Sequence, residues 1–139
     1  MSKEFTIQVR VYYEDTDAGG IVYYANYLKF CERARSDFIR ALGMSQTAML
    51  QSGRGFVVAK MQARFRKPAK FEDLLTVSCQ ISRMRHVALS FQQEVRAEDG
   101  TVLFELSCDV AFIDLKTGEL LPLPEDTTAK LKAYCNDEA

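Results

Sequence analysis

The sequence contains a single histidine, no tryptophan and no long run of apolar residues. Because His86 stands alone, no second histidine is available to complete a histidine dyad. A membrane-spanning helix needs roughly 18 consecutive apolar residues, and no segment reaches that length. Residues 1–4 are not followed by an apolar signal segment, so we expect a cytoplasmic protein with no membrane span.

Neither sign of charge is in excess, since the sequence has 18 Lys and Arg residues and 19 Asp and Glu residues and a formal net charge of -1. Without a basic excess the protein has no global field to attract nucleic acid, and we expect no nucleic-acid partner. The four cysteines match none of the spacings of zinc or redox motifs. We therefore expect buried free thiols at Cys31, Cys79 and Cys108, and neither a bound metal nor a cofactor.

The residues that are present are typical of one globular domain over residues 1–139, with 47% hydrophobic and 27% charged residues. Alternating apolar residues from Ile7 to Val11 predict a first strand. A helix is expected to start with Asn26 as its N-cap and to stop at Gly43. The predicted buried face of this helix consists of Tyr27, Phe30, Cys31, Ala34, Phe38, Ala41 and Leu42.

The second half of the chain shows the period-two alternation of strands. A short helix is expected over residues 45–51, followed by four strands and a final amphipathic helix near residues 125–134. Asp99–Gly100 predicts a hairpin turn between the last two strands. The expected apolar positions of the four strands are Val57, Ala59, Met61, Ala63 and Phe65; Leu75, Val77, Cys79 and Ile81; Leu89, Phe91 and Val95; and Val102, Phe104, Leu106, Cys108, Val110 and Phe112.

This order of elements predicts an α+β fold, because runs of strands joined by short turns favour an antiparallel sheet. The apolar face of the sheet is expected to curl around the long helix. Such a sheet leaves its edges and outer face to be covered. We therefore also expect the protein to form a homo-oligomer.

The segment between the first strand and the long helix carries the groups best suited to chemistry. Asp15 and Asp17 precede Gly19, Gly20 and the expected helix start. A carboxylate can attack an electrophile or take a proton from water. Backbone N–H groups at a helix start can hold the oxygen of a carbonyl as it becomes an oxyanion. The glycines would let a substrate approach the backbone closely.

The spacing of these residues leaves two other interpretations open. Asp15 and Asp17 can simply make the hydrogen bonds of a turn. Asp15, Asp17 and Gly20 also match positions 1, 3 and 6 of a calcium-binding EF-hand loop. Position 12 of that loop would be Asn26 rather than Glu, and the preceding segment alternates like a strand, so calcium is the less favoured alternative.

The run from Val11 to Leu42, including residues 13–23 and Glu32–Arg35, resembles the hotdog-fold acyl-CoA thioesterases of the YbgC and 4-hydroxybenzoyl-CoA thioesterase group. The resemblance extends over nearly the whole chain, since the later strands match in order and length. It implies a five-stranded antiparallel sheet wrapped around a long central helix, with a C-terminal helix. It also implies hydrolysis of a short-chain or aromatic acyl-CoA, with acyl-carrier protein as an alternative acyl carrier. Subunits of this family form dimers or tetramers with interfacial active sites.

The resemblance assigns roles to residues of the loop. The catalytic carboxylate falls on Asp17, acting either as nucleophile or as general base for water. The carbonyl-polarising backbone N–H falls on Tyr24, where the YbgC branch often carries His, and a backbone donor survives that difference. Asp15 is expected to shape the loop by accepting N–H bonds. Asp15, Gly20 and Tyr23 are also the expected substrate contacts.

Basic residues beside the only histidine are the expected contacts of the CoA phosphates. The resemblance favours Arg85 and His86, in the connection between two strands, because Arg forms charge-assisted bonds with phosphate. A solvated loop is the alternative. A second basic run is expected to be an exposed strand face, and consists of Lys60, Arg64, Arg66, Lys67 and Lys70.

Two competing functions remain at this point. A hotdog dehydratase needs a His paired with an acid, and His86 lies far in sequence from Asp17. A non-catalytic acyl-thioester binder, or an interaction module of an envelope or lipid-synthesis complex, would have the fold without the reaction. The intact Asp17 loop favours the thioesterase.

Overall fold

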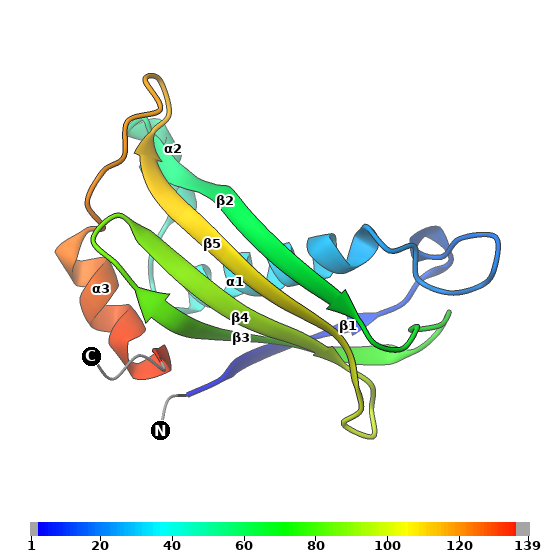
Figure 1. The fold of residues 1–139 in the computed structure, drawn as a ribbon. Coiled ribbons are helices and arrows are strands. Elements are labelled where there is room, and N and C mark those ends of the chain that lie inside the picture. The colour runs from blue at the N-terminus through cyan, green and yellow to red at the C-terminus, as the bar shows by residue number, and fades with distance from the viewer. Residues whose placement is uncertain (1–2, 136–139) are drawn as a thin grey trace.

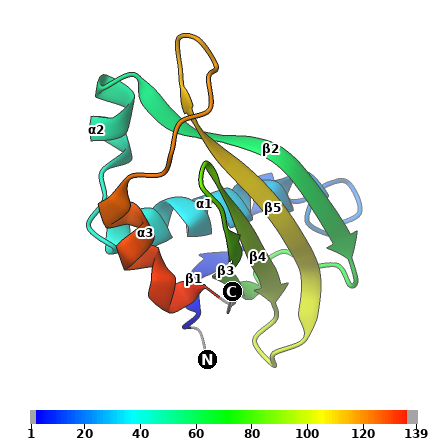
Figure 2. The ribbon, with the colours of Figure 1, turned by 60° about the vertical axis from the view of Figure 1, so that its left-hand side comes forward.

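A computed structural model describes residues 3–135 of the chain. Its five strands form one antiparallel sheet that curves around the long helix α1 (Asn26–Ala41), as Figures 1 and 2 show. The strand order is β1-β3-β4-β5-β2. The strands are β1 (Phe5–Arg10), β2 (Arg54–Phe65), β3 (Leu74–Met84), β4 (Ala88–Arg96) and β5 (Val102–Asp114). The predicted α+β hotdog architecture is therefore confirmed.

Two short helices lie at the end of the sheet where α1 ends (Figure 1). The first, α2 (Gln46–Gln51), is capped by Ser45, whose side chain accepts the Ala48 N–H. The second, α3 (Glu125–Leu131), continues into a 3-10 turn and supplies the predicted C-terminal helix. Within residues 3–135, no helix has both the length and the apolar composition to cross a membrane.

The core forms between the apolar face of α1 and the concave face of the sheet. Phe38 of α1 lies at its centre, with its ring 5.5 Å from that of Phe5, 6.2 Å from that of Phe91 and 4.8 Å from that of Tyr134. The predicted strand residues from Leu75 to Ile81 and from Phe104 to Phe112 are buried at alternating positions. The buried residues of α1 are Asn26, Tyr27, Phe30, Cys31, Ala34, Phe38 and Ile39.

Two details of the predicted α1 are wrong. The N-cap is Ala25 rather than Asn26, which is already helical and buried. The Asn26 side chain does not cap the helix, because its amide Nδ2 donates to the Asp15 carbonyl 2.8 Å away. Ala41, predicted to be buried, is exposed at the last turn.

The predicted alternation of β2 is also wrong over its first half. The pairing of β2 with β5 shifts by one residue between Val58 and Lys60, so Ala59 is the extra residue of a β-bulge. Before the bulge, Phe56 pairs with Phe112 and Val58 with Val110, which places Phe56 and Val58 on the concave face. Because a one-residue shift turns every side chain to the other face, Val57 and Ala59 do not share a face with Met61.

The predicted buried thiols are confirmed. Cys31, Cys79 and Cys108 are buried free cysteines, and Cys135 is half-buried. Burial raises the pKa of the Cys31 thiol to about 12 and also raises the pKa values of Cys79 and Cys108. These three groups are therefore neutral packing residues rather than nucleophiles.

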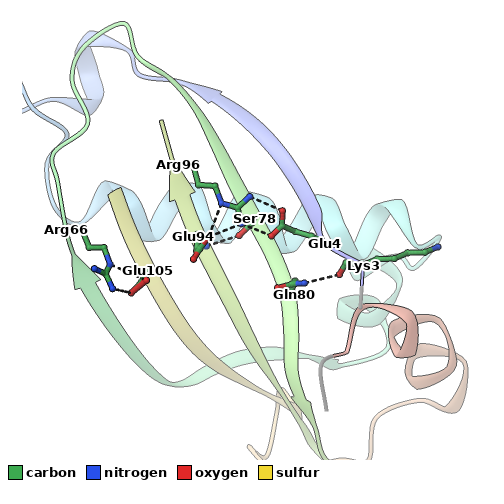
Figure 3. Close-up of polar contacts among 8 residues, drawn as sticks. All are labelled: Lys3, Glu4, Arg66, Ser78, Gln80, Glu94, Arg96 and Glu105. Atoms are coloured by element: carbon green, nitrogen blue, oxygen red, sulfur yellow. Dashed lines mark hydrogen bonds and ion pairs between the residues drawn. The ribbon is translucent and has the colours of Figure 1, made fainter. Parts of the chain in front are cut away.

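The convex face of the sheet carries polar side chains that pair with one another (Figure 3). The Arg96 guanidinium donates to both carboxylate oxygens of Glu4, at 2.9 and 2.6 Å, and to Glu94 at 2.9 Å. This pairing lowers the pKa of Glu4 and raises that of Arg96. Since β1 is an edge strand and Glu4 precedes it, the network fastens that edge to β4.

Candidate active site

The segment between β1 and α1 is held against the connection from β2 to β3. Val22 N–H donates to the Ala69 carbonyl at 2.9 Å, and Ile21 forms a bridge with Lys70. The phenol oxygen of Tyr27, in the first turn of α1, accepts the Ala69 N–H at 3.0 Å. These contacts fix the loop relative to the start of the helix, as a preorganised site requires.

Asp15 shapes this loop through both its side chain and its backbone. Its carboxylate accepts the Tyr12 N–H at 2.8 Å across a single 3-10 turn. Its carbonyl accepts two further bonds, from Tyr23 N–H at 2.9 Å and from the Asn26 side chain at 2.8 Å. A strand and a 3-10 turn, rather than a helix, precede Asp17, so the loop lacks the helix–loop–helix frame of an EF-hand.

Asp17 lies at the neck of a tight turn and remains exposed. Its N–H donates to Ile21 O at 2.9 Å, and its carbonyl accepts Gly20 N–H at 3.0 Å. One carboxylate oxygen accepts Gly19 N–H at 2.8 Å, while the other has no hydrogen-bond partner within residues 3–135. The carboxylate is therefore oriented by the turn, with one oxygen open to a ligand.

Gly19 and Gly20 each lack a side chain for a different structural reason. Gly20 has a φ of 78°, in the left-handed region that favours glycine. A Cβ at Gly19 would lie 3.2 Å from the Asp17 carboxylate oxygen, a contact tight enough to displace it. The turn that orients Asp17 thus depends on both residues.

Tyr24 lies in the turn that leads into α1. Asn26 N–H donates to Tyr23 O at 2.8 Å, which makes Tyr24 the second residue of that turn. The N–H of Tyr24 donates to no protein group in the described part of the chain. An unsatisfied N–H at the positive end of a helix is suited to hold a carbonyl oxygen.

Aromatic rings form a wall beside this helix start. The exposed rings of Tyr23 and Tyr24 lie 4.8 Å apart, and the hydrogen bond between their phenols raises the pKa of Tyr23. The Tyr24 ring also contacts Phe65, at the end of β2, at 6.3 Å. Phe65 lies 5.0 Å from the Phe104 ring, on which Tyr27 stacks at 4.8 Å.

A cavity of about 170 Å³ lies farther along α1, between this helix and the sheet. Its helix wall begins at Glu32, six residues after Asn26 and therefore about 9 Å along the helix axis. Its sheet wall is apolar. The residues that line it are Glu32, Arg35, Ser36, Ile39, Gln46, Phe56, Val57, Val58, Leu89, Phe91 and Val110.

Arg85 and His86 do not lie beside Asp17 in the same chain. They follow β3, which starts beside the loop, where Asp73 O accepts Val11 N–H, and runs away from it for about 33 Å. Figure 1 shows the β3–β4 connection and the loop at opposite ends of the molecule. His86 therefore cannot pair with Asp17 within one chain.

The Arg85 side chain lies over the convex face of the sheet. Its guanidinium donates to Ser90 Oγ at 3.3 Å and lies 3.8 Å from Asp109. The sequence did not indicate this placement of Arg85. It follows from the antiparallel order of the strands, because β3 starts beside the loop and its far end must lie away from it.

The sequence also did not identify the Asn26 side chain or Phe65 as parts of the site. The contacts of Asn26 with Asp15 and of Phe65 with Tyr24 join residues that are far apart in sequence.

Comparison with known proteins shows that the chain is similar to thioesterases in both sequence and fold. A family model described as the thioesterase-like superfamily matches residues 9–131. The acyl-CoA thioester hydrolase YbgC of Escherichia coli O6:H1 is 39% identical over 128 residues, covering 92% of this chain and 96% of that protein. A crystal structure from Bartonella henselae, described as a probable thioesterase, is 35% identical with a TM-score of 0.82, covering 88% of this chain and 100% of that one. The 1,4-dihydroxy-2-naphthoyl-CoA thioesterase of Synechocystis shares the fold at 23% identity and a TM-score of 0.88, covering 94% and 96% of the two chains.

Proposed function

Because this chain belongs to the thioesterase-like superfamily and is an acyl-CoA thioester hydrolase, we propose that its reaction takes place between the Asp17 carboxylate and the Tyr24 N–H. The observation that supports this assignment is that one loop presents both a negatively charged carboxylate and a free backbone hydrogen-bond donor. Within residues 3–135, one oxygen of the exposed carboxylate and one N–H at the helix start have no hydrogen-bond partner. The two flanking segments, residues 15–17 and 21–23, lie side by side through backbone bonds.

In the proposed reaction the thioester carbonyl oxygen accepts the Tyr24 N–H, which polarises the carbonyl and holds the oxyanion as it forms. Asp17 then acts in one of two ways. As a nucleophile its oxygen bonds to the carbonyl carbon, the C–S bond breaks, CoA leaves as thiolate, and water hydrolyses the mixed anhydride. As a general base it takes a proton from the attacking water. Incorporation of oxygen-18 from water into Asp17 under single turnover identifies the first route, because a general base gains no oxygen, and trapping the mixed anhydride identifies it when water attacks the acyl carbon instead.

The size of the acyl group is proposed from the cavity beside α1. Its volume of about 170 Å³ compares with roughly 150 Å³ for a cavity that binds benzene. A short aliphatic chain or one aromatic ring therefore fits within it. We expect a screen of free-CoA release over short, long and aromatic acyl-CoAs to show the highest kcat/KM for the short or aromatic ones. Highest turnover with long chains would contradict this assignment.

The subunit is proposed to act as a homodimer paired through β2. This strand pairs only with β5 within the described residues, so its other edge is open. It also exposes apolar side chains at Val57, Val58, Met61 and Phe65. Antiparallel pairing of two β2 strands would close this edge and set the apolar side chains of each face beside those of the partner strand. It would also turn the partner subunit's Arg85 and His86 toward the end where this subunit's Asp17 lies, so that their proposed phosphate contacts are made across the interface.

The dimer has a direct test. Met61→Lys places a charge on the exposed concave face of β2, where pairing would bury it. We expect this variant to shift from dimer toward monomer in light scattering and to lose most of its acyl-CoA hydrolysis. Lys60→Ala, one residue away on the convex face, serves as the control. A Met61→Lys protein that stays dimeric would contradict the proposed interface.

A further inference from the structure

An open groove at the end of β2 carries three cationic side chains near the site. This β2-end groove is lined by Arg64, Phe65, Arg66, Lys67, Val102 and Glu105. Phe65 belongs to both the groove and the site, because its ring contacts that of Tyr24. Lys67 lies two residues before Ala69, which holds the loop through the Val22 N–H. The groove and the Asp17 loop therefore share one end of the molecule.

Within residues 3–135, acidic side chains pair with only part of the positive charge of the groove. Three cations face one carboxylate, Glu105, and Arg66 occupies it through contacts of 3.2 Å to each oxygen (Figure 3). Arg64 is the cross-strand neighbour of Glu105 but forms no ion pair with it or with any other described residue. Lys67 forms none either, although its charge contributes, after the hydrogen bonds from Thr101, to the lowered pKa of Asp99.

The backbone that carries these cations is well fixed. The N–H groups of Arg66 and Lys67 both donate to Leu103 O, at 2.8 and 3.1 Å. The Phe65 side chain, 53% exposed, packs on Phe104 from the inner side. Two cations on a fixed strand end, with no ion-pair partner within residues 3–135, suit the binding of an anion.

We propose that the β2-end groove binds phosphate of the CoA substrate, with Arg64 and Lys67 as the phosphate contacts. The proposal rests on the proposed function, since it names the surface that holds the non-reacting end of the thioester. It adds phosphate contacts from the subunit that supplies Asp17 to those proposed above for the partner subunit's Arg85 and His86. Within one subunit, Arg85 lies at the far end of the molecule, beside Asp109.

The test compares one acyl group carried by CoA, by 3′-dephospho-CoA and by pantetheine, which has no nucleotide. Arg64→Gln/Lys67→Gln removes the two unpaired cations. Lys116→Gln/Lys130→Gln is the matched control, because it removes the same charge from exposed positions in the turn after β5 and in α3. Figure 1 shows these two elements at the opposite end of the molecule from the Asp17 loop. We expect the first variant to raise KM for acyl-CoA about tenfold at low salt, with kcat little changed and KM for acyl-pantetheine unaltered. The control should change none of these values.

The rise in KM should shrink as salt is added, since exposed charges are screened. The proposal is overturned if the acyl-CoA to acyl-pantetheine ratio of KM values is the same in Arg64→Gln/Lys67→Gln as in the unmodified protein. If the unmodified protein hydrolyses no thioester, the proposed function fails instead. Calorimetric binding of CoA and of pantetheine to the same variants then tests whether the groove binds phosphate, because this measurement needs no hydrolysis. Equal CoA affinity in both double variants would contradict phosphate binding by Arg64 and Lys67, whatever the outcome of the hydrolysis assay.

Discussion

Asp17→Asn is expected to lower kcat for acyl-CoA hydrolysis by roughly a thousandfold or more, whichever of its two roles the carboxylate has. An amide neither attacks a thioester nor takes a proton from water at neutral pH. The fold should be unaffected, because Asn keeps an oxygen that can accept the Gly19 N–H and the residue is exposed. The rate of CoA release and the thermal midpoint, measured on the same preparation, check both statements.

Asp15→Asn is the matched control for this prediction, since it makes the same chemical change two residues away. The Asp15 carboxylate accepts the Tyr12 N–H, and an amide oxygen can do the same. We therefore expect Asp15→Asn to retain far more activity than Asp17→Asn. Loss of activity in both variants to the same degree would mean that the charge of the loop, rather than one carboxylate, is what the reaction needs.

Tyr24→Pro is expected to lower kcat by roughly a hundredfold to a thousandfold, the usual effect of losing one oxyanion donor. Proline has no backbone N–H, so the substitution removes the proposed donor itself. The turn should tolerate it. Tyr24 is the second residue of the turn closed by Asn26 N–H and Tyr23 O, and that position favours proline. The measurements are steady-state kcat and circular dichroism.

Two further variants separate the backbone of Tyr24 from its side chain. Tyr24→His and Tyr24→Phe both keep the N–H, and Tyr24→Phe also keeps the ring that contacts Phe65. We expect both to retain kcat within about tenfold of the unmodified protein while Tyr24→Pro does not. Equal losses in all three variants would assign the effect to the phenol and would contradict an oxyanion role for the N–H.

The order of elements could be predicted because each element carries a local signal. The alternation in β3 and β5 and the helical spacing of α1 depend only on near neighbours in sequence. The start of β2 carries no such signal, since Phe56, Val57, Val58 and Ala59 are all apolar and any register suits them. Only pairing with β5 shows that Ala59 is the bulge.

The candidate site was predictable as a list of residues rather than as a geometry. Asp17 and Tyr24 could be named from one loop. Asn26 was expected to cap its own helix, yet its side chain binds Asp15 O, a contact across eleven residues of irregular chain that no local preference encodes. The separation of Arg85 from Asp17 is likewise a property of the sheet order rather than of either segment.

A structure of the Asp17→Asn variant with an acyl-CoA bound tests the central claim most directly. We expect the thioester carbonyl oxygen to lie about 2.7–3.1 Å from the Tyr24 nitrogen, with its carbon within about 3.5 Å of an oxygen or nitrogen of Asn at position 17, or of a water held by it. The acyl group should extend toward Glu32 and the cavity. A thioester bound elsewhere, with its carbonyl away from the Tyr24 N–H, would contradict the account.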